Sequence, residues 1–174
     1  QKIGPLWALT AGISGKDGGL LKVQKKHCPG ADIGFVGEIK EVQPKILFDL
    51  LEKDFLPVVC PIGFDANDQT YNINADDAAY AIASAMQTEK LAFLTDIEGV
   101  YRDINDKKSL LSSLTTKEAQ EFIQSKAAYG GMLPKLQNCI QAIEQGVSRV
   151  HILDGRIAHC LLLEIFTDKG IGTV

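Results

Sequence analysis

Short apolar segments alternate with segments of helical spacing along this chain, and this alternation constrains the fold more than any other feature. Strands are expected over residues 6–13, 33–39, 56–60, 91–95 and 149–153, and helices over residues 44–53, 75–86, 115–126, 132–145 and 158–167. The strand segments lack the apolar–polar alternation of half-exposed strands, which is typical of strands covered on both faces. The pattern therefore predicts an α/β protein with a mostly parallel sheet sandwiched between helices.

Composition excludes several classes of protein. The 174 residues are 45% hydrophobic and 23% charged, close to the average for globular proteins, so a disordered or collagen-like chain is excluded. No apolar run approaches the roughly 18 residues of a membrane-spanning helix, so an integral membrane protein is not expected. The formal net charge of −4 argues against a general nucleic-acid-binding protein, which would carry a basic surplus.

The cysteines and histidines do not form a recognisable metal-binding pattern. None of the four cysteines stands in a CxxC spacing, which argues against a zinc knuckle or a redox motif, and no metal site is expected. Cys60 and Cys139 lie in apolar surroundings, so both are expected to be buried thiols. The cysteine usage suits a reducing compartment and predicts a cytoplasmic location.

Ligands of open parallel sheets bind beyond the carboxyl ends of the strands, so the segments that follow each predicted strand were considered first. The loop over residues 14–19 resembles a phosphate-binding loop but departs from the Walker A pattern. Asp17 stands where that pattern requires a metal-binding hydroxyl, and Thr10 stands where it requires the first glycine. A phosphate-binding loop and a simple tight turn therefore both remain open.

The segment Asn72-Ile73-Asn74-Ala75-Asp76 precedes a predicted alanine-rich helix. The amides of Asn72 and Asn74 can donate to a carboxylate or phosphate, and a helix N-terminus favours an anion. Asp76 can orient lysines in such a site. Alternatively, Asn74 is only the N-cap, and Asp76 compensates the helix dipole. Local sequence does not separate these two interpretations.

Two further segments carry groups suited to nucleotide chemistry. After the strand at 91–95, the carboxylate of Asp96 can accept from a ribose hydroxyl, and Gly99 allows close approach of the backbone to a ring. Gly130 and Gly131 precede a predicted helix whose first turn contains Lys135. Such a turn can cradle phosphate oxygens, and the lysine can neutralise charge on a transferred phosphoryl group. An ordinary loop and a glycine hinge with a surface lysine are the alternatives.

Seven segments resemble the amino acid kinase superfamily and, within it, the N-acetyl-L-glutamate kinases of arginine biosynthesis. They are ISGKDG, DIGFVGEI, LPVVCPIG, YNINADDAA, LAFLTDIEGVYRD, GGMLPK and HILDGRIAHCLLLEIFTDKGIGT, in family order over nearly the whole chain. The NINAD and GGMxPK motifs together with the DGR…H…LLxE…GxGT tail resemble the acetylglutamate branch more than the carbamate, aspartate, glutamate 5- or uridylate kinases.

The resemblance implies an amino acid kinase-like fold and an ATP-dependent phosphorylation of the side-chain carboxylate of N-acetyl-L-glutamate, which gives an acyl phosphate. Asn72 would bind the acetylglutamate with Asn74 beside it, Asp76 would organise the catalytic lysines, and Lys135 would stabilise the phosphoryl group in flight. Mg²⁺ would bridge the ATP phosphates rather than occupy a protein cage. The nucleotide site would comprise Thr95, Asp96, Gly99, Tyr101, Tyr129, Gly130, Gly131 and Met132.

The resemblance also implies regulation and assembly. The C-terminal pattern is similar to that of the branch inhibited by arginine, and His159, Glu164, Gly170 and Gly172 would hold this effector. Without that resemblance, His159 is equally a helix cap and Arg156 a salt-bridge residue. Family members form homodimers or hexamers, in the cytoplasm or in a plastid. Residues 1–88 would form part of the acetylglutamate-binding lobe, and residues 89–174 the nucleotide-binding lobe.

Family members are typically longer by roughly a hundred residues at the N-terminus, beyond the length expected of one domain. Those residues supply a first strand with a catalytic lysine, glycine-rich turns and an arginine for the substrate, and no His-Gly-Gly-Gly occurs here. We therefore expect a C-terminal portion with an incomplete N-terminal part and little kinase activity on its own. Another amino acid kinase with a different acceptor, or a non-catalytic nucleotide- or arginine-binding module, are the alternatives.

Overall fold

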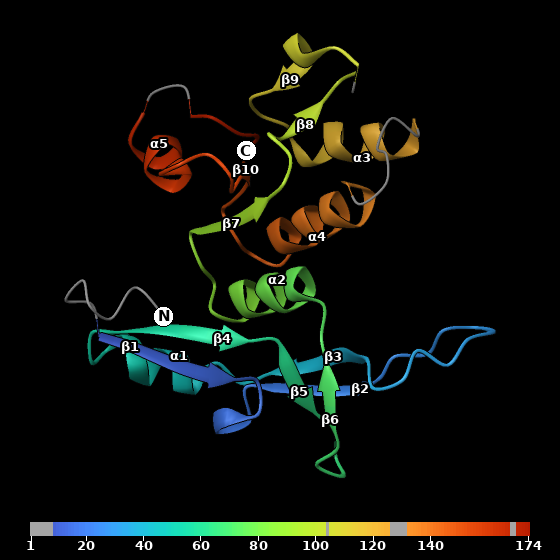
Figure 1. Ribbon diagram of the computed structural model, residues 1–174, viewed down its shortest axis with the longest axis vertical. Coiled ribbons are helices and arrows are strands. Elements are labelled where there is room, and N and C mark those ends of the chain that lie inside the picture. Colours follow the sequence, from blue (N-terminus) through green and yellow to red (C-terminus); the bar gives the residue numbers. More distant parts are fainter. Residues whose placement is uncertain (1–8, 104, 126–131, 168–169) are drawn as a thin grey trace. The chain divides into compact units, whose positions relative to one another are not determined.

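The computed structural model describes residues 9–103, 105–125, 132–167 and 170–174, and the chain divides into two compact units, Gln1–Met86 and Gln87–Val174 (Figure 1). The α/β prediction is confirmed. Two parallel strand pairs, one in each unit, and a mixed four-stranded sheet in the first unit make up most of the β-structure. Each unit has its own strands and helices.

The first unit contains a parallel pair and a mixed sheet. Strand β1 (Leu9–Ser14) pairs in parallel with β4 (Phe55–Cys60), and α1 (Lys45–Leu51) packs on β4. In the mixed sheet, the order β3-β2-β5-β6 joins antiparallel and parallel neighbours. The bounds of its elements are β2 (Leu21–Lys25), β3 (Gly37–Val42), β5 (Ile62–Phe64) and β6 (Thr70–Asn72), followed by α2 (Ala75–Ala85).

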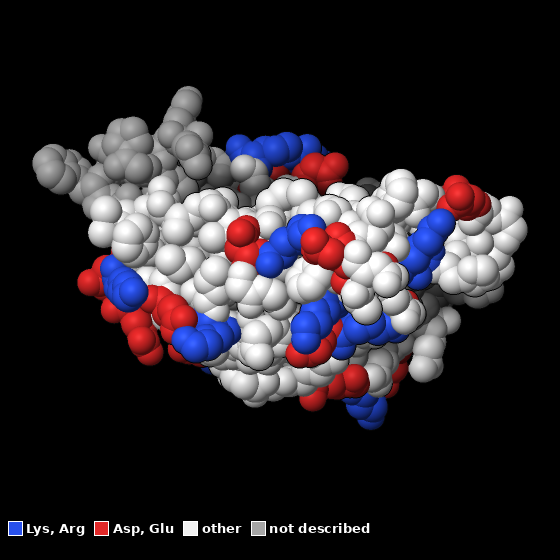
Figure 2. Space-filling view, turned by 90° about the horizontal axis from the view of Figure 1, so that it is seen from below, with Lys and Arg blue, Asp and Glu red and all other residues white. Residues whose placement is uncertain are grey.

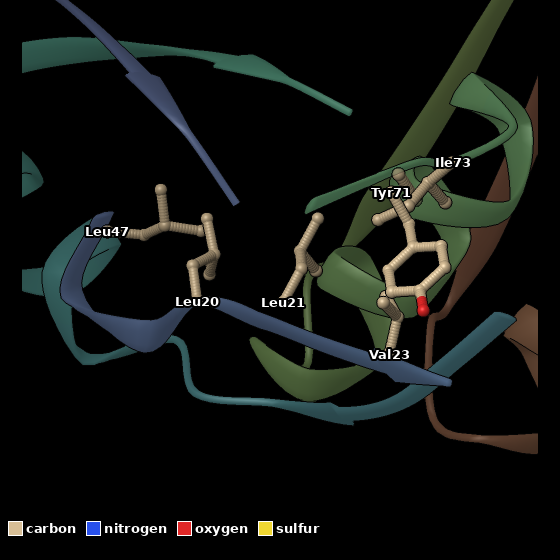
Figure 3. Packing of buried hydrophobic residues seen from close by; sticks show 7 residues of the cluster. Leu20, Leu21, Val23, Leu47, Tyr71 and Ile73 are labelled. Carbon is tan, nitrogen blue, oxygen red and sulfur yellow. The ribbon is translucent and has the colours of Figure 1, made fainter. Parts of the chain in front are cut away.

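A cluster of apolar side chains joins the elements of the first unit. Leu20 and Leu21 are fully buried, and Leu47 of α1 and Ile73 just before α2 pack with them (Figure 3). The segment that leads from β6 into α2 is therefore anchored by Ile73, which is 2% exposed, between two polar residues that face solvent. Burial of one large aliphatic side chain contributes about 1.5–3 kcal/mol, so this anchor fixes the candidate substrate segment in place.

The second unit is built on the parallel pair β7 (Lys90–Thr95) and β10 (Arg149–Asp154). Helices α4 (Met132–Glu144) and α5 (Cys160–Phe166) contact β10, and α3 (Thr116–Gln124) packs against α4. A short antiparallel pair, β8 (Val100–Tyr101) and β9 (Leu110–Leu111), follows the carboxyl end of β7. The carboxyl ends of β7 and β10 therefore meet at one edge, as in other parallel sheets that bind ligands there.

Local capping explains the start of α3. Thr115 accepts from the Glu118 N–H, and the Glu118 carboxylate accepts from the Thr115 N–H at 2.8 Å, which forms a capping box at the start of α3. The Thr115 hydroxyl also donates to the Glu118 carboxylate at 2.7 Å, and this hydrogen bond, followed by that of the Thr115 backbone N–H, holds the pKa of Glu118 below its usual value. The sequence predicted this helix from the same residues, and the prediction is confirmed.

Three expectations were wrong in detail. The strand expected over residues 33–39 is β3 and begins only at Gly37. The helix expected over residues 158–167 begins at Cys160, because His159 adopts a left-handed backbone conformation with φ of 59°. Cys60 is exposed rather than buried and Cys139 is half-buried. Cys60 is exposed because one face of the β1–β4 pair is uncovered, as the exposure of 45% at Leu56 and 50% at Val58 indicates.

Surface charges of both signs are interspersed on the face drawn in Figure 2. Lys22 pairs with Glu41 at 2.9 Å, and Lys45 pairs with Asp49 at 2.6 Å. Such exposed pairs contribute little stability, but they leave no extended single-sign patch among the described residues on this face. None of the helices in the described part of the chain is long and apolar enough to cross a membrane.

Candidate functional site

The segment from Asn72 to Asp76 lies at the entrance of α2 in the first unit. Asn72 ends β6, is exposed, and donates its backbone N–H to the Phe35 carbonyl at 2.8 Å. Asn74 caps α2, because its Oδ1 accepts from the N–H groups of Asp76 at 2.9 Å and Asp77 at 3.1 Å. The capping interpretation therefore holds for Asn74, and its side-chain NH₂ group is the part that can donate to a ligand. Asp76 is half-buried in the first turn.

The loop after β1 forms a tight turn. The backbone N–H and the hydroxyl of Ser14 both donate to the Asp17 carboxylate, at 2.7 and 2.8 Å. These two hydrogen bonds, that of the backbone first, hold the pKa of Asp17 below its usual value. Lys16 turns to Asp68, with its Nζ 3.0 Å from Oδ1, and also donates to the Thr70 hydroxyl. The carboxylate of Asp17 occupies the position of an anion in this turn, which favours the simple turn over a phosphate-binding loop.

In the second unit, the candidate nucleotide residues begin where β7 and β10 end together. Thr95 lies opposite Asp154 in the parallel register, and the Gly155 N–H donates to the Thr95 carbonyl at 2.8 Å. Thr95 donates its hydroxyl to the carboxylate of the exposed Asp96 at 3.3 Å. Asp96 therefore presents a carboxylate to solvent beyond the strand ends, where it can accept from a ligand hydroxyl.

The next residues connect this edge to β8. The Tyr101 hydroxyl donates to the Glu98 carboxylate, and this hydrogen bond, together with partial burial, raises the pKa of Tyr101 to about 12. Gly99 has φ of 155°, and a Cβ at this position would lie 2.6 Å from the Thr173 hydroxyl oxygen. Glycine at position 99 thus admits the C-terminal segment. Because the Tyr101 hydroxyl is hydrogen-bonded to Glu98, the ring of Tyr101 is the part that can contact a ligand.

An ion pair at the same edge was not among the expected site residues. Arg156 donates from Nε and Nη2 to the two carboxylate oxygens of Asp154, at 2.9 and 2.8 Å. Asp154 is 5% exposed, and hydrogen bonding from Arg156 holds its pKa below the usual value. The salt-bridge interpretation of Arg156 is therefore confirmed, and the DGR sequence directly after a strand was the signal for it.

Lys135 lies in the first turn of α4, and its Nζ is 5.3 Å from the centroid of the Phe93 ring. Met132 begins α4 and packs against the cluster of Val100, Leu136 and Ile152. The expected site residues Tyr129, Gly130 and Gly131 lie outside the residues that the structure describes. The helix and lysine of the predicted phosphate cradle are thus in place, whereas its glycine turn is not described.

Two of the C-terminal candidate residues, Gly170 and Gly172, meet at the carboxylate of a third, Glu164, which is 8% exposed. Its Oε2 accepts from the N–H groups of Ile171 at 2.7 Å and Gly172 at 3.2 Å, and a Cβ on Gly170 would lie 2.6 Å from it. Its Oε1 accepts from His151 Nδ1 at 2.8 Å. Burial alone would raise the pKa of Glu164, but these hydrogen bonds outweigh it and hold the pKa below the usual value.

His151 rather than His159 is therefore the histidine of this cluster. His159 is exposed at the start of α5, and among the described residues no side-chain hydrogen bond from it to the helix is present. The His151 Nε2 atom is buried and has no hydrogen-bond partner in the described residues. The signal in the sequence was a histidine inside the apolar strand RVHIL, where a titratable side chain needs a partner.

No group of three or more histidine, cysteine, aspartate or glutamate side chains is placed to hold a metal ion within the described ranges. A nucleotide-associated cation needs fewer protein ligands, because Mg²⁺ is commonly held by one or two carboxylates together with substrate phosphates and water.

Comparison with known proteins gives consistent results. A protein of Campylobacter jejuni subsp. jejuni named acetylglutamate kinase is 57% identical over 163 residues, which are 94% of this chain and 57% of that protein. A protein of the same name from Thermoanaerobacter sp. is 51% identical over 172 residues, 99% of this chain and 57% of its own length. The chain thus spans somewhat more than half the length of these relatives.

A solved structure is also similar. The N-acetylglutamate synthase of Neisseria gonorrhoeae, in complex with coenzyme A and N-acetyl-glutamate, matches 95% of this chain and 37% of its own, with a TM-score of 0.84 and 28% identity. The same synthase in complex with coenzyme A and L-arginine matches with a TM-score of 0.80. The family model described as the amino acid kinase family matches residues 7–154. The chain therefore belongs to the amino acid kinase family.

Proposed function

We propose that this chain is part of an enzyme that phosphorylates the side-chain carboxylate of N-acetyl-L-glutamate with ATP, in arginine biosynthesis. The observation that carries the proposal is the 57% identity over 163 residues to a protein named acetylglutamate kinase. Its support from the fold is that the candidate residues lie at strand ends and helix starts, where parallel α/β proteins bind ligands.

The first unit supplies acetylglutamate-binding residues in this proposal. Asn72 is exposed at the end of β6 and contacts the substrate. The side-chain NH₂ group of Asn74 donates beside it, while its Oδ1 continues to cap α2. Asp76 orients the cationic side chains that surround the phosphoryl group. Helix α2 is 11 residues long, and the positive end of its dipole favours an acidic ligand.

The second unit supplies the nucleotide site in this proposal. Asp96 accepts from a ribose hydroxyl, and the ring of Tyr101 forms part of the wall. Thr95 orients the Asp96 carboxylate through its hydroxyl, which donates at 3.3 Å. Gly99 and Met132 line the site with Tyr129, Gly130 and Gly131, which are proposed from the GGMLPK motif alone.

The chemistry asks for positioning and charge stabilisation more than for a base. The acceptor carboxylate is already a nucleophile, so its oxygen attacks the γ-phosphorus of ATP while the bond to the β–γ bridging oxygen breaks and ADP leaves. Negative charge spreads over the transferred group, and the ammonium of Lys135 stabilises it. Mg²⁺ bound with ATP supplies neutralisation of the phosphates. The products are an acyl phosphate and ADP, and no proton is transferred.

We further propose that the Glu164 cluster binds arginine as an effector. Glu164 carries a buried carboxylate, the group that pairs with an ammonium or guanidinium group. It lies beside Gly170, Gly172 and His151, whose Nε2 has no hydrogen-bond partner in the described part of the chain. The similar synthase structure contains L-arginine, which favours this ligand. His159 would then contribute from the start of α5. We also propose that the protein forms a homo-oligomer, either a dimer or a hexamer, and that it acts in the cytoplasm.

Turnover by the complete native protein tests the main proposal. With ATP, Mg²⁺ and N-acetyl-L-glutamate, hydroxylamine should trap the acyl phosphate as a hydroxamate, and Lys135→Ala should abolish it. Lys117→Ala, at an exposed lysine of α3 in the same unit, is the matched control and should leave turnover unchanged. Turnover with glutamate or aspartate instead would favour another amino acid kinase. ATP binding without any turnover would favour a non-catalytic module.

A further inference from the structure

The ammonium of Lys135 lies over the face of an aromatic ring. Its Nζ is 5.3 Å from the centroid of Phe93, within the distance of about 6 Å at which a cation is attracted by the ring quadrupole. Phe93 is 4% exposed, and Lys135 is half-buried. The Lys135 side chain therefore shields one face of the buried Phe93 ring from solvent.

Both backbones that carry this pair are fixed by packing. Phe93 lies in the middle of β7, in register with Ile152 of β10. Lys135 precedes Leu136, which is 3% exposed and packs with Ile152 and Val100. The Phe93 backbone is thus held by the pairing of β7 with β10, and the first turn of α4 is held by the cluster of Val100, Leu136 and Ile152. The ring then restricts where the ammonium lies at the end of its flexible stem.

A lysine that stabilises a moving phosphoryl group needs such a restriction. Its charge sits at the end of a flexible four-carbon stem, and misplacement by a small distance lowers the rate strongly. A planar ring beneath the ammonium favours the extended rotamers that keep it there. A leucine at position 93 would fill similar space but would lack the quadrupole.

We infer that Phe93 is a positioning residue for Lys135: its ring holds the lysine ammonium at the place from which it meets the transferred phosphoryl group. This inference rests on the proposed function, in which Lys135 touches that group. Phe93 thereby joins the residues proposed for the reaction, although it lies inside a strand and its side chain carries no polar atom.

Fluorination of the ring tests the inference with little change of shape. Mono-, di- and trifluorinated phenylalanine at position 93 of the complete native protein weaken the quadrupole stepwise. We expect kcat to fall with each fluorine, by three- to tenfold in total, with KM for ATP changed less than twofold and thermal stability unchanged. The same series at Phe122 of α3 is the control, because that ring packs beside the same cluster and carries no described cation. A kcat that does not depend on fluorination at position 93 overturns the inference.

A second measurement needs no turnover. The ring current of Phe93 should shift the ε-methylene protons of Lys135 upfield in the nuclear magnetic resonance spectrum of the native protein, and Phe93→Leu should remove the shift. Phe122→Leu should leave it in place. If the shift is absent, the contact and the inference both fail. If Lys135→Ala retains full turnover, the proposed role of the lysine fails and the inference with it. If Lys135→Ala abolishes turnover but fluorination has no effect, only the inference is overturned.

Discussion

The carboxylate of Glu164 and the imidazole of His151 form a buried hydrogen bond of 2.8 Å between Oε1 and Nδ1, across 13 residues of sequence. The second oxygen of Glu164 holds the N–H groups of Ile171 and Gly172. One side chain of α5 therefore ties a strand of the sheet to the C-terminal segment, and the same side chain is the centre of the proposed effector site.

Replacement of Glu164 by alanine should destabilise the protein by about 2–4 kcal/mol, because it leaves a buried imidazole and two backbone N–H groups without their acceptor. Urea unfolding of the native protein, compared with Glu121→Ala at an exposed position of α3, measures this cost. Equal stability of the two variants would show that the hydrogen bonds of Glu164 contribute nothing net.

Glu164 should also contribute to the pH dependence of stability. The pKa of Glu164 in the folded protein lies below the usual value of 4.5, so the contribution of this group is complete above that pH and is lost as the pH falls through 4.5 and below. Glu164→Gln should lose this contribution at neutral pH, and its stability should therefore depend less on pH in the acid range. An unchanged acid limb in the variant would contradict the lowered pKa.

The Tyr101 phenol should titrate abnormally late. Its hydrogen bond to Glu98 raises its pKa to about 12 from the usual value of 10.0. The phenolate absorbance of the protein, minus that of Tyr101→Phe, isolates this group, and Glu98→Gln should return the midpoint toward 10. Because the folded pKa is raised, the associated stability is present below pH 10 and is lost between pH 10 and 12. A midpoint near 10 with Glu98 intact would exclude the interaction.

Asn74 should combine two separable roles. Asn74→Ala should cost about 1 kcal/mol of stability because α2 loses its cap, whereas Asn74→Ser should keep most of the cap. If Asn74 also contacts the substrate as proposed, both variants should raise KM for N-acetyl-L-glutamate, since neither has the side-chain NH₂ group. Normal KM in Asn74→Ser would leave Asn74 with the capping role alone.

Gly99 should not tolerate a side chain. A Cβ at this position would lie 2.6 Å from the Thr173 hydroxyl oxygen, and the φ of 155° is unfavourable for other residues. We expect Gly99→Ala to lower stability by about 1–3 kcal/mol, because the C-terminal segment must shift. Gly19→Ala is the control for backbone strain, since its φ is also positive and no atom lies within 4 Å of an added Cβ. Similar losses in both variants would assign the effect to strain.

Local sequence predicted those features that neighbouring residues determine. The capping box of Thr115 and Glu118, the cap at Asn74 and the apolar strand of β10 each depend on residues close in sequence. The exposure of Cys60 was not predictable, because it depends on which face of the β1–β4 pair is covered.

The candidate site was predicted less completely than the fold. His151 was missed because its partner Glu164 lies on another element. A histidine inside the apolar strand RVHIL indicates that a partner is needed, but not which residue supplies it. The effector role of His159 was predicted from the resemblance of the C-terminal pattern. The structure places His159 exposed at the start of α5 with a left-handed backbone, and its effector role stays a prediction. The contact of Phe93 with Lys135 joins a strand to a helix much further along the chain. No local sequence pattern indicates such a contact.

The most direct test of the account is hydroxamate formation by the complete native protein with ATP, Mg²⁺ and N-acetyl-L-glutamate, measured beside its Lys135→Ala variant. The account predicts ATP-dependent hydroxamate with the native protein and a loss of at least a hundredfold in kcat in the variant, as expected when a group that stabilises developing charge is removed. Undiminished turnover in Lys135→Ala, or no acyl phosphate from N-acetyl-L-glutamate with the native protein, would contradict it.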